Sequence, residues 1–240
     1  MPRSIDTNPA LGEIVENWTE PARPTGSELA GRYARLIPLD AYTHAEALFG
    51  QFYGYDQLWD YMPYGPFDDA AAYHGWISET VAQPEHFFYT IQNLETGAWE
   101  GVASYLRINP ASGSIEVGHI CMSPALQRKR AATEAMFLMM EWAFDAGYRR
   151  YEWKCNAGNL ASRRAAQRYG FSYEGVFRQA TISKGRNRDT AWFAVIDKEW
   201  PALRAAFQQW LAPSNFDDSQ QRNRLSDLTR AVRVADDPAL

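Results

Sequence analysis

The stretch Gly118–Phe144 reads GHICMSPALQRKRAATEAMFLMMEWAF and has the parts of a phosphate-binding turn. It starts as an apolar β-strand, breaks at Ser123-Pro124, crosses the basic run Gln127–Arg130, and continues as a helix-forming segment that ends at Gly147. The first turn of a helix leaves backbone N–H groups without intrahelical partners at the positive end of the dipole. Together with three basic side chains, these amides predict a site for a diphosphate.

Three β-rich runs precede this turn. They are His86–Ile91, Trp99–Leu106 and Ser114–Met122, separated by turns at Asn93–Gly97 and Asn109–Gly113. Connections this short join antiparallel neighbours. The sequence therefore predicts three antiparallel strands, the third of which leads into the basic turn.

The segment after the long helix predicts a parallel strand. Arg150–Cys155 alternates like a strand, and it must run parallel to Ser114–Met122 because a helix intervenes. The elements expected further on are a helix capped by Asn159 over Leu160–Tyr169, a hairpin of Phe171–Ser183 and Asp189–Ile196 around Lys184–Arg188, and a helix near Glu199–Leu211.

The N-terminal part predicts a strand and two helices. These are a strand at Gly31–Leu39, a helix capped by Asp40, an aromatic loop at Tyr53–Tyr64, and a helix that starts at Asp68 or Asp69 and ends before Pro84. We expect residues 1–30 to form an extended arm, residues 31–211 one domain, and residues 212–240 a polar tail. The first ten residues are expected to be disordered.

Composition sets limits on the class of protein. The 240 residues are 46% hydrophobic and 22% charged, which is typical of a globular chain long enough for a full core. No apolar run approaches the roughly 20 residues of a membrane helix, and the N-terminus lacks a signal-peptide core. We therefore predict a soluble, cytoplasmic protein with no membrane partner. Cys121, Cys155 and four scattered histidines stand at no metal-ligand spacing, so no metal is expected.

The net charge of −5 is unevenly distributed. Residues 127–190 carry thirteen Lys and Arg against six Asp and Glu, a net +7 that leaves −12 elsewhere. The positive half thus contains the predicted phosphate turn, although solvated helix faces would also account for Arg149, Arg163 and Arg168. An acidic chain without a recognisable nucleic-acid module argues against a nucleic-acid partner.

The basic turn resembles motif A of the GCN5-related N-acetyltransferases (GNAT), which reads Q/R-x-x-G-x-G/A between a strand and a helix. Gln127 and Ala132 fit this pattern, and Arg130 occupies the position of the first glycine. The predicted element order also matches that fold over residues 31–211. The segments similar to the ribosomal-protein Nα-acetyltransferases of RimJ/RimL type are Arg32–Leu39, Asn159–Ser162 and Arg168–Phe171. The resemblance implies an α/β (α+β) acyl-CoA N-acyltransferase fold, a mixed central sheet with splayed strands flanked by helices.

The resemblance further implies acetyl-CoA as co-substrate. Its pantetheine arm would insert between two splayed strands, and its diphosphate would lie on the basic turn. The residues expected to bind it are Ile120, Cys121, Met122, Gln127, Arg128, Lys129, Arg130, Ala131, Ala132, Thr133 and Asn159. Helix capping is an alternative role for Asn159, and the two roles can coexist.

The resemblance implies direct transfer to an amine. Glu116, eleven residues before Gln127, would accept the amine proton, although an exposed strand glutamate is the alternative. A backbone N–H near Cys121 would support the oxyanion. Ala166 replaces the tyrosine that commonly protonates the thiolate, so Ser162 is the candidate to assist or no acid is needed. Strict alternation along the strand predicts that His119 faces away from Glu116.

The acceptor amine is left open between a protein N-terminus and a small molecule, and a longer acyl group is also open. Trp59, Tyr61, Tyr64 and Tyr105 could wall its pocket, or could be aromatic core. The arm, the final hairpin and the last helix are compatible with a homodimer. The alternative to an enzyme is a non-catalytic module of the same fold that binds CoA or an anion.

Overall fold

The computed structural model of the chain describes residues 12–217 and 220–240. Its strands are β1 Leu29–Ala30, β2 Ala34–Pro38, β3 Phe87–Asn93, β4 Trp99–Asn109, β5 Ser114–Met122, β6 Arg150–Asn156, β7 Ser172–Ser183, β8 Arg186–Ile196, β9 Phe216–Asp217 and β10 Gln220–Gln221. Its helices are α1 Ala41–Phe52, α2 Ala70–Val81, α3 Arg130–Asp145, α4 Leu160–Arg168, α5 Trp200–Leu211 and α6 Leu225–Arg230, with 3-10 turns η2 Asp56–Trp59, η3 Pro110–Ser112 and η4 Pro213–Asn215.

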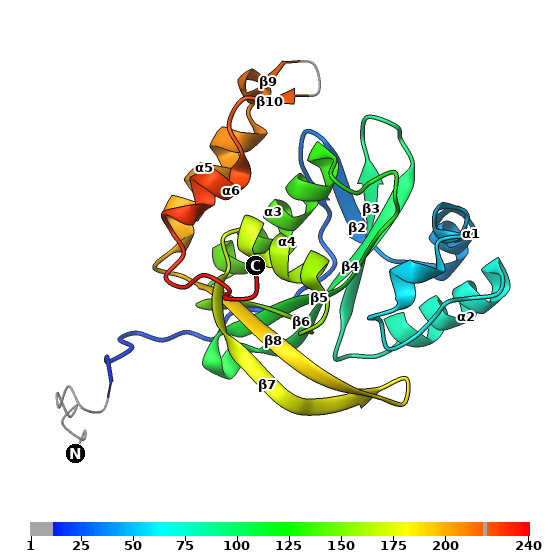
Figure 1. Cartoon of the computed structure of the whole chain (residues 1–240), viewed down its shortest axis with the longest axis horizontal. Coiled ribbons are helices and arrows are strands. Elements are labelled where there is room, and N and C mark those ends of the chain that lie inside the picture. Colours follow the sequence, from blue (N-terminus) through cyan, green and yellow to red (C-terminus); the bar gives the residue numbers. More distant parts are fainter. Residues whose placement is uncertain (1–11, 218–219) are drawn as a thin grey trace.

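The central sheet has the strand order β1-β2-β3-β4-β5-β6-β8-β7 (Figure 1). Within it β5 and β6 pair in parallel, and the other neighbouring strands pair antiparallel. Helix α3 makes the crossover between the two parallel strands, as a parallel connection requires. The mixed sheet and the antiparallel run that leads into the basic turn confirm the predicted fold class.

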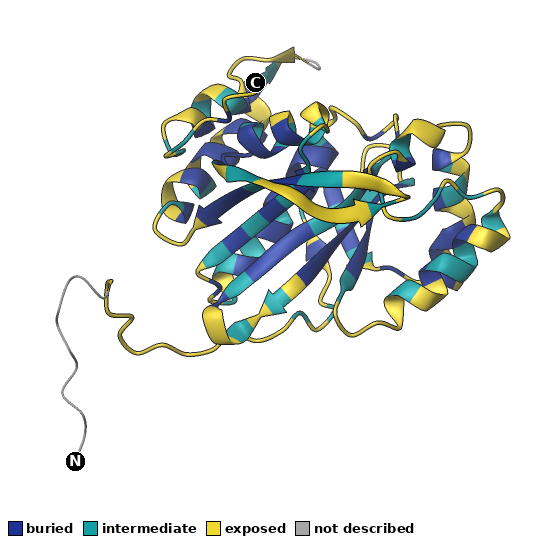
Figure 2. Cartoon of the chain, turned by 60° about the horizontal axis from the view of Figure 1, so that its bottom comes forward, coloured by how far each residue is buried: buried dark blue, intermediate teal, exposed yellow. Residues whose placement is uncertain are grey.

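Two helical layers cover the sheet. On one face, α3 and α5 pack against strand residues such as Tyr105, Val117 and Phe193. On the other face, α1 and α2 pack against Phe88, Val102 and other residues of β3 and β4. Figure 2 shows that the central strands are buried between these layers, whereas the far end of the β7–β8 hairpin is exposed.

Side-chain caps fix where three helices begin. Asp40 accepts a hydrogen bond from the Thr43 N–H at 2.8 Å at the start of α1, and Asp69 accepts one from Ala72 at 2.7 Å at the start of α2. Asn159 caps α4 in the same way. Each side-chain oxygen pairs with an amide that the helix itself leaves unpaired. The predicted caps at Asp40 and Asn159 are confirmed, and Asp69 rather than Asp68 starts α2.

Two segments differ from the sequence-based expectation. Strand β8 begins at Arg186, so the expected loop Lys184–Arg188 shrinks to a two-residue turn. Both turn residues are left-handed, with φ of 48° at Lys184 and 71° at Gly185, the conformation that fits the twist of a tight hairpin. The expected aromatic loop contains η2.

The expected terminal segments pack on the domain where the structure describes them. The structure describes the N-terminal arm from Gly12 onward. The first ten residues, for which disorder is expected, lie outside the described residues. Tyr148 donates a hydrogen bond to the Ala22 carbonyl of the arm at 3.2 Å. In the expected polar tail, α6 buries Leu225 and Thr229, so this segment contributes to the core. No helix in residues 12–217 or 220–240 has the length and apolar character needed to cross a membrane.

A buried carboxylate joins α3 to the first long strand. Glu134 accepts hydrogen bonds from the N–H groups of Arg32 at 3.0 Å, Tyr33 at 2.5 Å and Ala34 at 2.7 Å. Three amide donors satisfy a charge that would be costly to bury alone. Gly31 is required beside it, because a Cβ there would lie 2.3 Å from Glu134 Oε2.

Gly31→Ala is therefore expected to lower the free energy of unfolding by about 1–3 kcal/mol, because the Glu134 carboxylate must move away from its backbone donors. Urea denaturation followed by circular dichroism measures the change. The control is Gly50→Ala on the exposed side of α1, where a Cβ meets nothing within 4 Å and alanine favours the helix. Equal stability changes in the two variants would contradict the proposed contact.

Candidate active site

The parallel pair β5 and β6 separates part of the way along its length. Pairing runs from Ser114 with Arg150 to Val117 with Trp153 and then stops, while β5 continues to Met122. A cleft of about 690 Å³ occupies the gap. The backbone of residues 118–122 therefore presents an unpaired edge to it on the β6 side, which an extended ligand could pair with like an added strand.

A β-bulge in β5 sets which side chains face the cleft. Val102 pairs with Cys121 and Ser104 pairs with Gly118, so β5 has one extra residue there, and His119 has a left-handed φ of 50°. The bulge turns His119 toward the α1–α2 side of the sheet. There its Nδ1 lies 2.9 Å from the Tyr64 hydroxyl.

The bulge corrects the expectation for His119. Glu116 alternates with Val117, which packs on the α3 side, so Glu116 and His119 share the α1–α2 face. Strict alternation fails here because the extra residue shifts the period by one. Burial lowers the pKa of His119 to about 4, so the ring is neutral near pH 7.

The N-terminus of α3 forms the other end of the cleft. Lys129 is the residue before the helix, and no side chain caps the first turn. Gln127 lines the cleft and its side-chain amide donates to the Met122 carbonyl at 2.9 Å. Amides at a helix start are available to an anion when no side chain pairs with them. The arrangement at Gln127–Thr133 therefore fits a diphosphate.

Arg130 does not point at this turn. Its guanidinium pairs with Glu95 and lies over the rings of Tyr33, at 4.6 Å, and Phe216, at 5.0 Å. This corrects the expectation that the Arg130 side chain binds the diphosphate. Arg130 is the first residue of α3, and the left-handed residue of the turn is Arg128, with a φ of 64°.

Glu116 is buried beside two cations at the inner end of the cleft. It is 2% exposed, with Arg107 Nη1 2.7 Å and Lys154 Nζ 2.9 Å from its carboxylate oxygens. Burial raises the pKa of Glu116, and the two cations oppose that rise. Lys154 also lies 3.8 Å over the Trp192 ring. The alternative of an exposed strand glutamate is thus wrong, since the carboxylate is enclosed in the cleft.

Residues of β5, β6 and α4 complete the inner wall. Asn159 and Ser162 both line the cleft. Asn159 Oδ1 accepts the Ser162 N–H at 3.0 Å, which leaves the amide NH2 group of Asn159 without a partner among the described residues. Ser162 Oγ accepts a hydrogen bond from Trp153 Nε1 at 3.0 Å. Burial raises the pKa of the Cys121 thiol to about 12, as expected for a packing residue rather than a nucleophile.

The four aromatic residues expected around the acceptor are placed differently from one another. Tyr61 lines the cleft and donates to the Gly158 carbonyl at 3.2 Å. Tyr64 lies behind the cleft wall, where its hydroxyl is 2.9 Å from Nδ1 of the lining residue His119. Tyr105 is fully buried on the α3 face, where its hydroxyl donates to the Met139 carbonyl at 2.6 Å. This corrects the expectation that Tyr105 walls the acceptor pocket, because the alternation of side chains along β4 directs Tyr105 into the core beside α3, away from the cleft.

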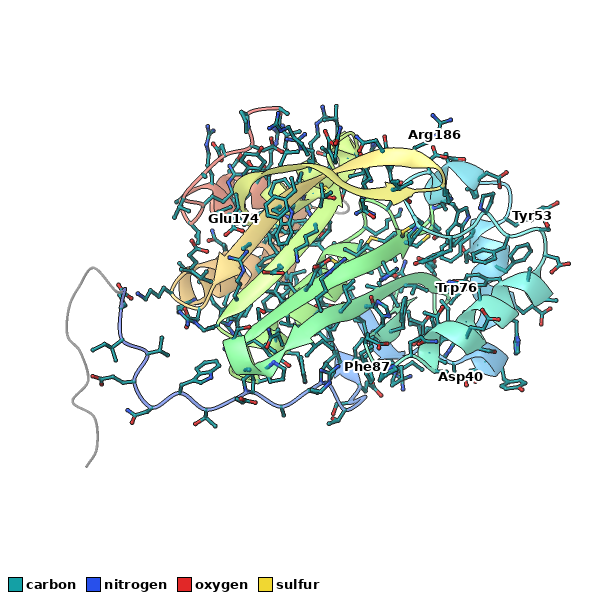
Figure 3. The ribbon with its side chains drawn as sticks, turned by 90° about the horizontal axis from the view of Figure 1, so that it is seen from below. Asp40, Tyr53, Trp76, Phe87, Glu174 and Arg186 are labelled. Atoms are coloured by element: carbon teal, nitrogen blue, oxygen red, sulfur yellow. The ribbon has the colours of Figure 1, made fainter. Side chains whose placement is uncertain are left out.

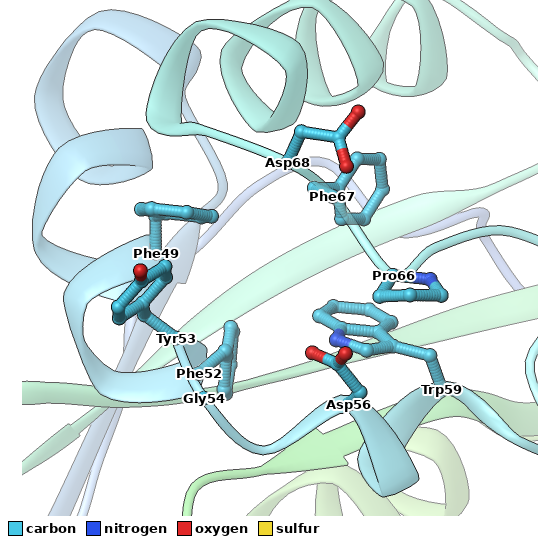
Figure 4. A pocket seen from close by; sticks show the side chains of 9 residues that line it. All are labelled: Phe49, Phe52, Tyr53, Gly54, Asp56, Trp59, Pro66, Phe67 and Asp68. Carbon is cyan, nitrogen blue, oxygen red and sulfur yellow. The ribbon is translucent and has the colours of Figure 1, made fainter.

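Trp59 faces a second hollow, of about 190 Å³ (Figure 4). The hollow has aromatic walls and two carboxylates, and its lining residues are Phe49, Phe52, Tyr53, Gly54, Asp56, Trp59, Pro66, Phe67 and Asp68. It shares no lining residue with the larger cleft. Within residues 12–217 and 220–240, no three His, Cys, Asp or Glu side chains gather as metal ligands would.

The β7–β8 hairpin covers one side of the cleft, a feature that sequence reasoning missed. Figure 3 shows the hairpin extending across the sheet toward the α1–α2 side, with Arg186 at its tip. Lys184 Nζ donates to the carbonyl oxygens of Trp59 at 2.8 Å and Gly65 at 2.7 Å. These bonds join the hairpin to the aromatic segment, and Arg188 from β8 lines the cleft below them.

The C-terminal segment supports the loop that carries Asn159. Arg163 forms two hydrogen bonds with the Asp237 carboxylate, Nε to Oδ2 at 2.6 Å and Nη2 to Oδ1 at 2.5 Å, and donates to the Ala157 carbonyl at 2.8 Å. The Asp237 side chain is 0% exposed. The pKa of Arg163 is raised by these bonds to Asp237.

Comparisons with known proteins place the chain among acetyltransferases. The family described as "Acetyltransferase (GNAT) domain" matches residues 34–172. A GCN5-related N-acetyltransferase from Brucella melitensis is 43% identical, with a TM-score of 0.88 over 90% of this chain and 100% of that one. A probable GNAT acetyltransferase from Chromobacterium violaceum is also 43% identical, with a TM-score of 0.76 over 79% and 96%.

The RimJ/RimL resemblance has a structural counterpart. RimL, the ribosomal L7/L12 α-N-protein acetyltransferase, shares the fold, with a TM-score of 0.61 at 19% identity over 74% of this chain and 99% of that one. No curated protein sequence matches the chain.

Asp237→Ala is expected to lower the free energy of unfolding by about 3–5 kcal/mol, because it leaves the Arg163 guanidinium buried without its partner. Thermal and urea unfolding monitored by tryptophan fluorescence measure the loss. The matched control is Asp217→Ala, which removes an exposed partner of Arg222 and should cause no measurable change. An Asp237→Ala protein as stable as the control would show that the tail contact does not support the fold.

Proposed function

Because the chain belongs to the GNAT family and is an acetyl-CoA-dependent N-acetyltransferase, we propose that it passes the acetyl group directly to a primary amine in a ternary complex. The observation that carries the proposal is one cleft with an unpaired strand edge, an uncapped helix N-terminus at one end and a buried carboxylate at the other. The acceptor is a protein N-terminus or a small-molecule amine.

The cleft suits a long co-substrate with an amide-bearing arm. Residues Ile120–Met122 offer backbone groups to the pantetheine, and the free amide NH2 group of Asn159 faces it from the opposite wall. The diphosphate lies on the backbone amides of Gln127–Thr133, with Arg128 and Lys129 adding charge. Arg130 supplies its backbone N–H only, because Glu95 holds its side chain.

Glu116 is the proposed general base. Attack on the thioester requires a neutral amine, and the nucleophile loses its proton as the new C–N bond forms. The Glu116 carboxylate accepts that proton directly or through water. Its burial raises its pKa toward the working pH, which strengthens it as a base, while Arg107 and Lys154 keep it ionised.

The other two steps need little assistance. The backbone N–H of Cys121 is the proposed donor to the oxyanion as the thioester carbonyl becomes tetrahedral. Collapse of that intermediate breaks the C–S bond, and a thiol with a reference pKa near 8.5 leaves as a tolerable thiolate. The Ser162 hydroxyl, on the cleft wall, is the proposed donor to that thiolate.

The cytoplasmic location and the homodimer stay predictions.

Arg128→Glu is expected to weaken acetyl-CoA binding at least about tenfold, because it places a carboxylate beside the diphosphate. Isothermal titration calorimetry with acetyl-CoA measures the dissociation constant. Arg186→Glu, the same charge reversal at the exposed hairpin tip, should leave binding unchanged. Absence of binding heat in the unmodified protein at high concentration would disprove the proposal.

Glu116→Gln is expected to lower kcat by about 10²–10⁴-fold and to change acetyl-CoA affinity little. In the unmodified enzyme the rate should fall as pH drops through the raised pKa of Glu116, and this acidic limb should vanish in the variant. CoA-thiol release over an amine library, measured from pH 5 to 9, checks both effects. Equal rates and profiles in the two proteins would assign Glu116 a purely structural role. No release with any amine would favour a non-catalytic CoA-binding module.

A further inference from the structure

We propose that the acceptor amine carries an anionic group, a carboxylate or a phosphate, and that Arg188 binds this group in the cleft. The inference rests on the proposed function and narrows its substrate class. Four cationic side chains line the cleft, namely Arg107, Lys154, Lys184 and Arg188. Glu116 is the one carboxylate among the lining residues, so the acceptor end of the cleft has an excess of positive charge.

Three of the four cations already have partners. Arg107 and Lys154 pair with Glu116 at 2.7 and 2.9 Å. Lys184 donates to two backbone carbonyls on the aromatic segment. Their positions are therefore fixed by the protein itself, and a ligand is not needed to hold them.

Arg188 lacks such partners. Its Nε is buried and has no hydrogen-bond acceptor, and its guanidinium forms no ion pair with any residue in the described part of the chain. A buried donor without an acceptor is costly, and most buried polar atoms in proteins are paired. By contrast, Arg150 and Arg163, which are also partly or largely buried, have carboxylate partners. The unpaired Arg188 thus indicates that a bound ligand supplies the missing hydrogen-bond acceptor.

The position of Arg188 fits the acceptor rather than the diphosphate. It lies on β8 opposite Thr181, in the hairpin that covers the cleft. It lines the same cleft as His119 on β5 and Cys155 on β6. Its charge adds to the lowering of the pKa of His119 and opposes the rise that burial causes in the pKa of Cys155, as expected for a cation over the gap between these strands. The diphosphate turn has its own cations, Arg128 and Lys129, on a different element.

Glu116 and Arg188 would bind two different groups of the same acceptor molecule. Glu116 attracts the amine and accepts its proton, while the guanidinium of Arg188 can donate two parallel hydrogen bonds to a carboxylate or a phosphate. One acceptor that bears both groups would satisfy both residues. An amine without an anionic group would leave the buried Nε of Arg188 without a hydrogen-bond acceptor, so it should be the poorer substrate.

The test compares matched acceptors by CoA-thiol release. The carboxylate pairs are phenylalanine with phenylalaninamide and glycylphenylalanine with its C-terminal amide, and the phosphate pair is phosphoethanolamine with ethanolamine. In the unmodified enzyme, kcat/KM should be at least about tenfold higher for the anionic member of one kind of pair. Which kind responds identifies the anion as carboxylate or phosphate.

Arg188→Gln should remove most of that preference, and Arg186→Gln at the exposed hairpin tip should keep it. Comparison of ratios between proteins cancels the different basicities of the paired amines. Acetyl-CoA affinity should stay within about twofold in both variants, as calorimetry can show. A preference that survives in Arg188→Gln, equal rates for both members of every pair, or a loss of acetyl-CoA affinity in that variant would overturn the inference.

A second measurement separates this inference from the proposed function. If no amine is acetylated although acetyl-CoA binds, the proposed function fails, and the anion site is tested alone. Inorganic phosphate, titrated with CoA saturating its own site, should raise the melting temperature of the unmodified protein and of Arg186→Gln but not of Arg188→Gln. An equal shift, or none, in all three proteins would overturn the anion site.

Discussion

The separation of β5 from β6 is the constraint on which the rest of the site depends. Each strand keeps a full partner on its outer side, since β5 pairs with β4 as far as Met122 and β6 pairs with β8 as far as Asn156. Only the inner edges part, beyond Val117 and Trp153. The sheet therefore remains continuous while a row of backbone groups stays unpaired in its middle, and such groups are satisfied at lowest cost by an extended, amide-bearing ligand.

The bulge in β5 determines which side chains of this strand lie on the same face of the sheet. Because one extra residue resets the alternation, Glu116 and His119 face the same side, and Cys121 packs behind them against the α1–α2 layer. The Glu116 carboxylate lies at the inner end of the cleft, enclosed by residues of three strands. A buried charge of this kind is tolerable only with the cations beside it, so Arg107 and Lys154 are as much a part of the site as the Glu116 carboxylate.

Segments far apart in the sequence complete the cleft. Lys184 joins the hairpin to the aromatic segment, 125 residues away at Trp59. Asp237 holds Arg163, and through it the loop before α4, from the C-terminal segment. In both contacts a charged group forms directional hydrogen bonds, and few other side-chain positions would allow them. These bonds therefore position the hairpin and the loop more definitely than apolar packing alone would.

The sequence by itself determined the order of the elements, the caps at Asp40 and Asn159, and the basic turn before α3, because local hydrogen bonding and hydrophobic period govern all of them. Only the tertiary structure decided the bulge at His119, the turning of Arg130 to Glu95, the inward burial of Tyr105 and the placement of Arg188 over the gap. Those outcomes depend on strand register and on partners from distant segments, and neither leaves a mark in the local pattern.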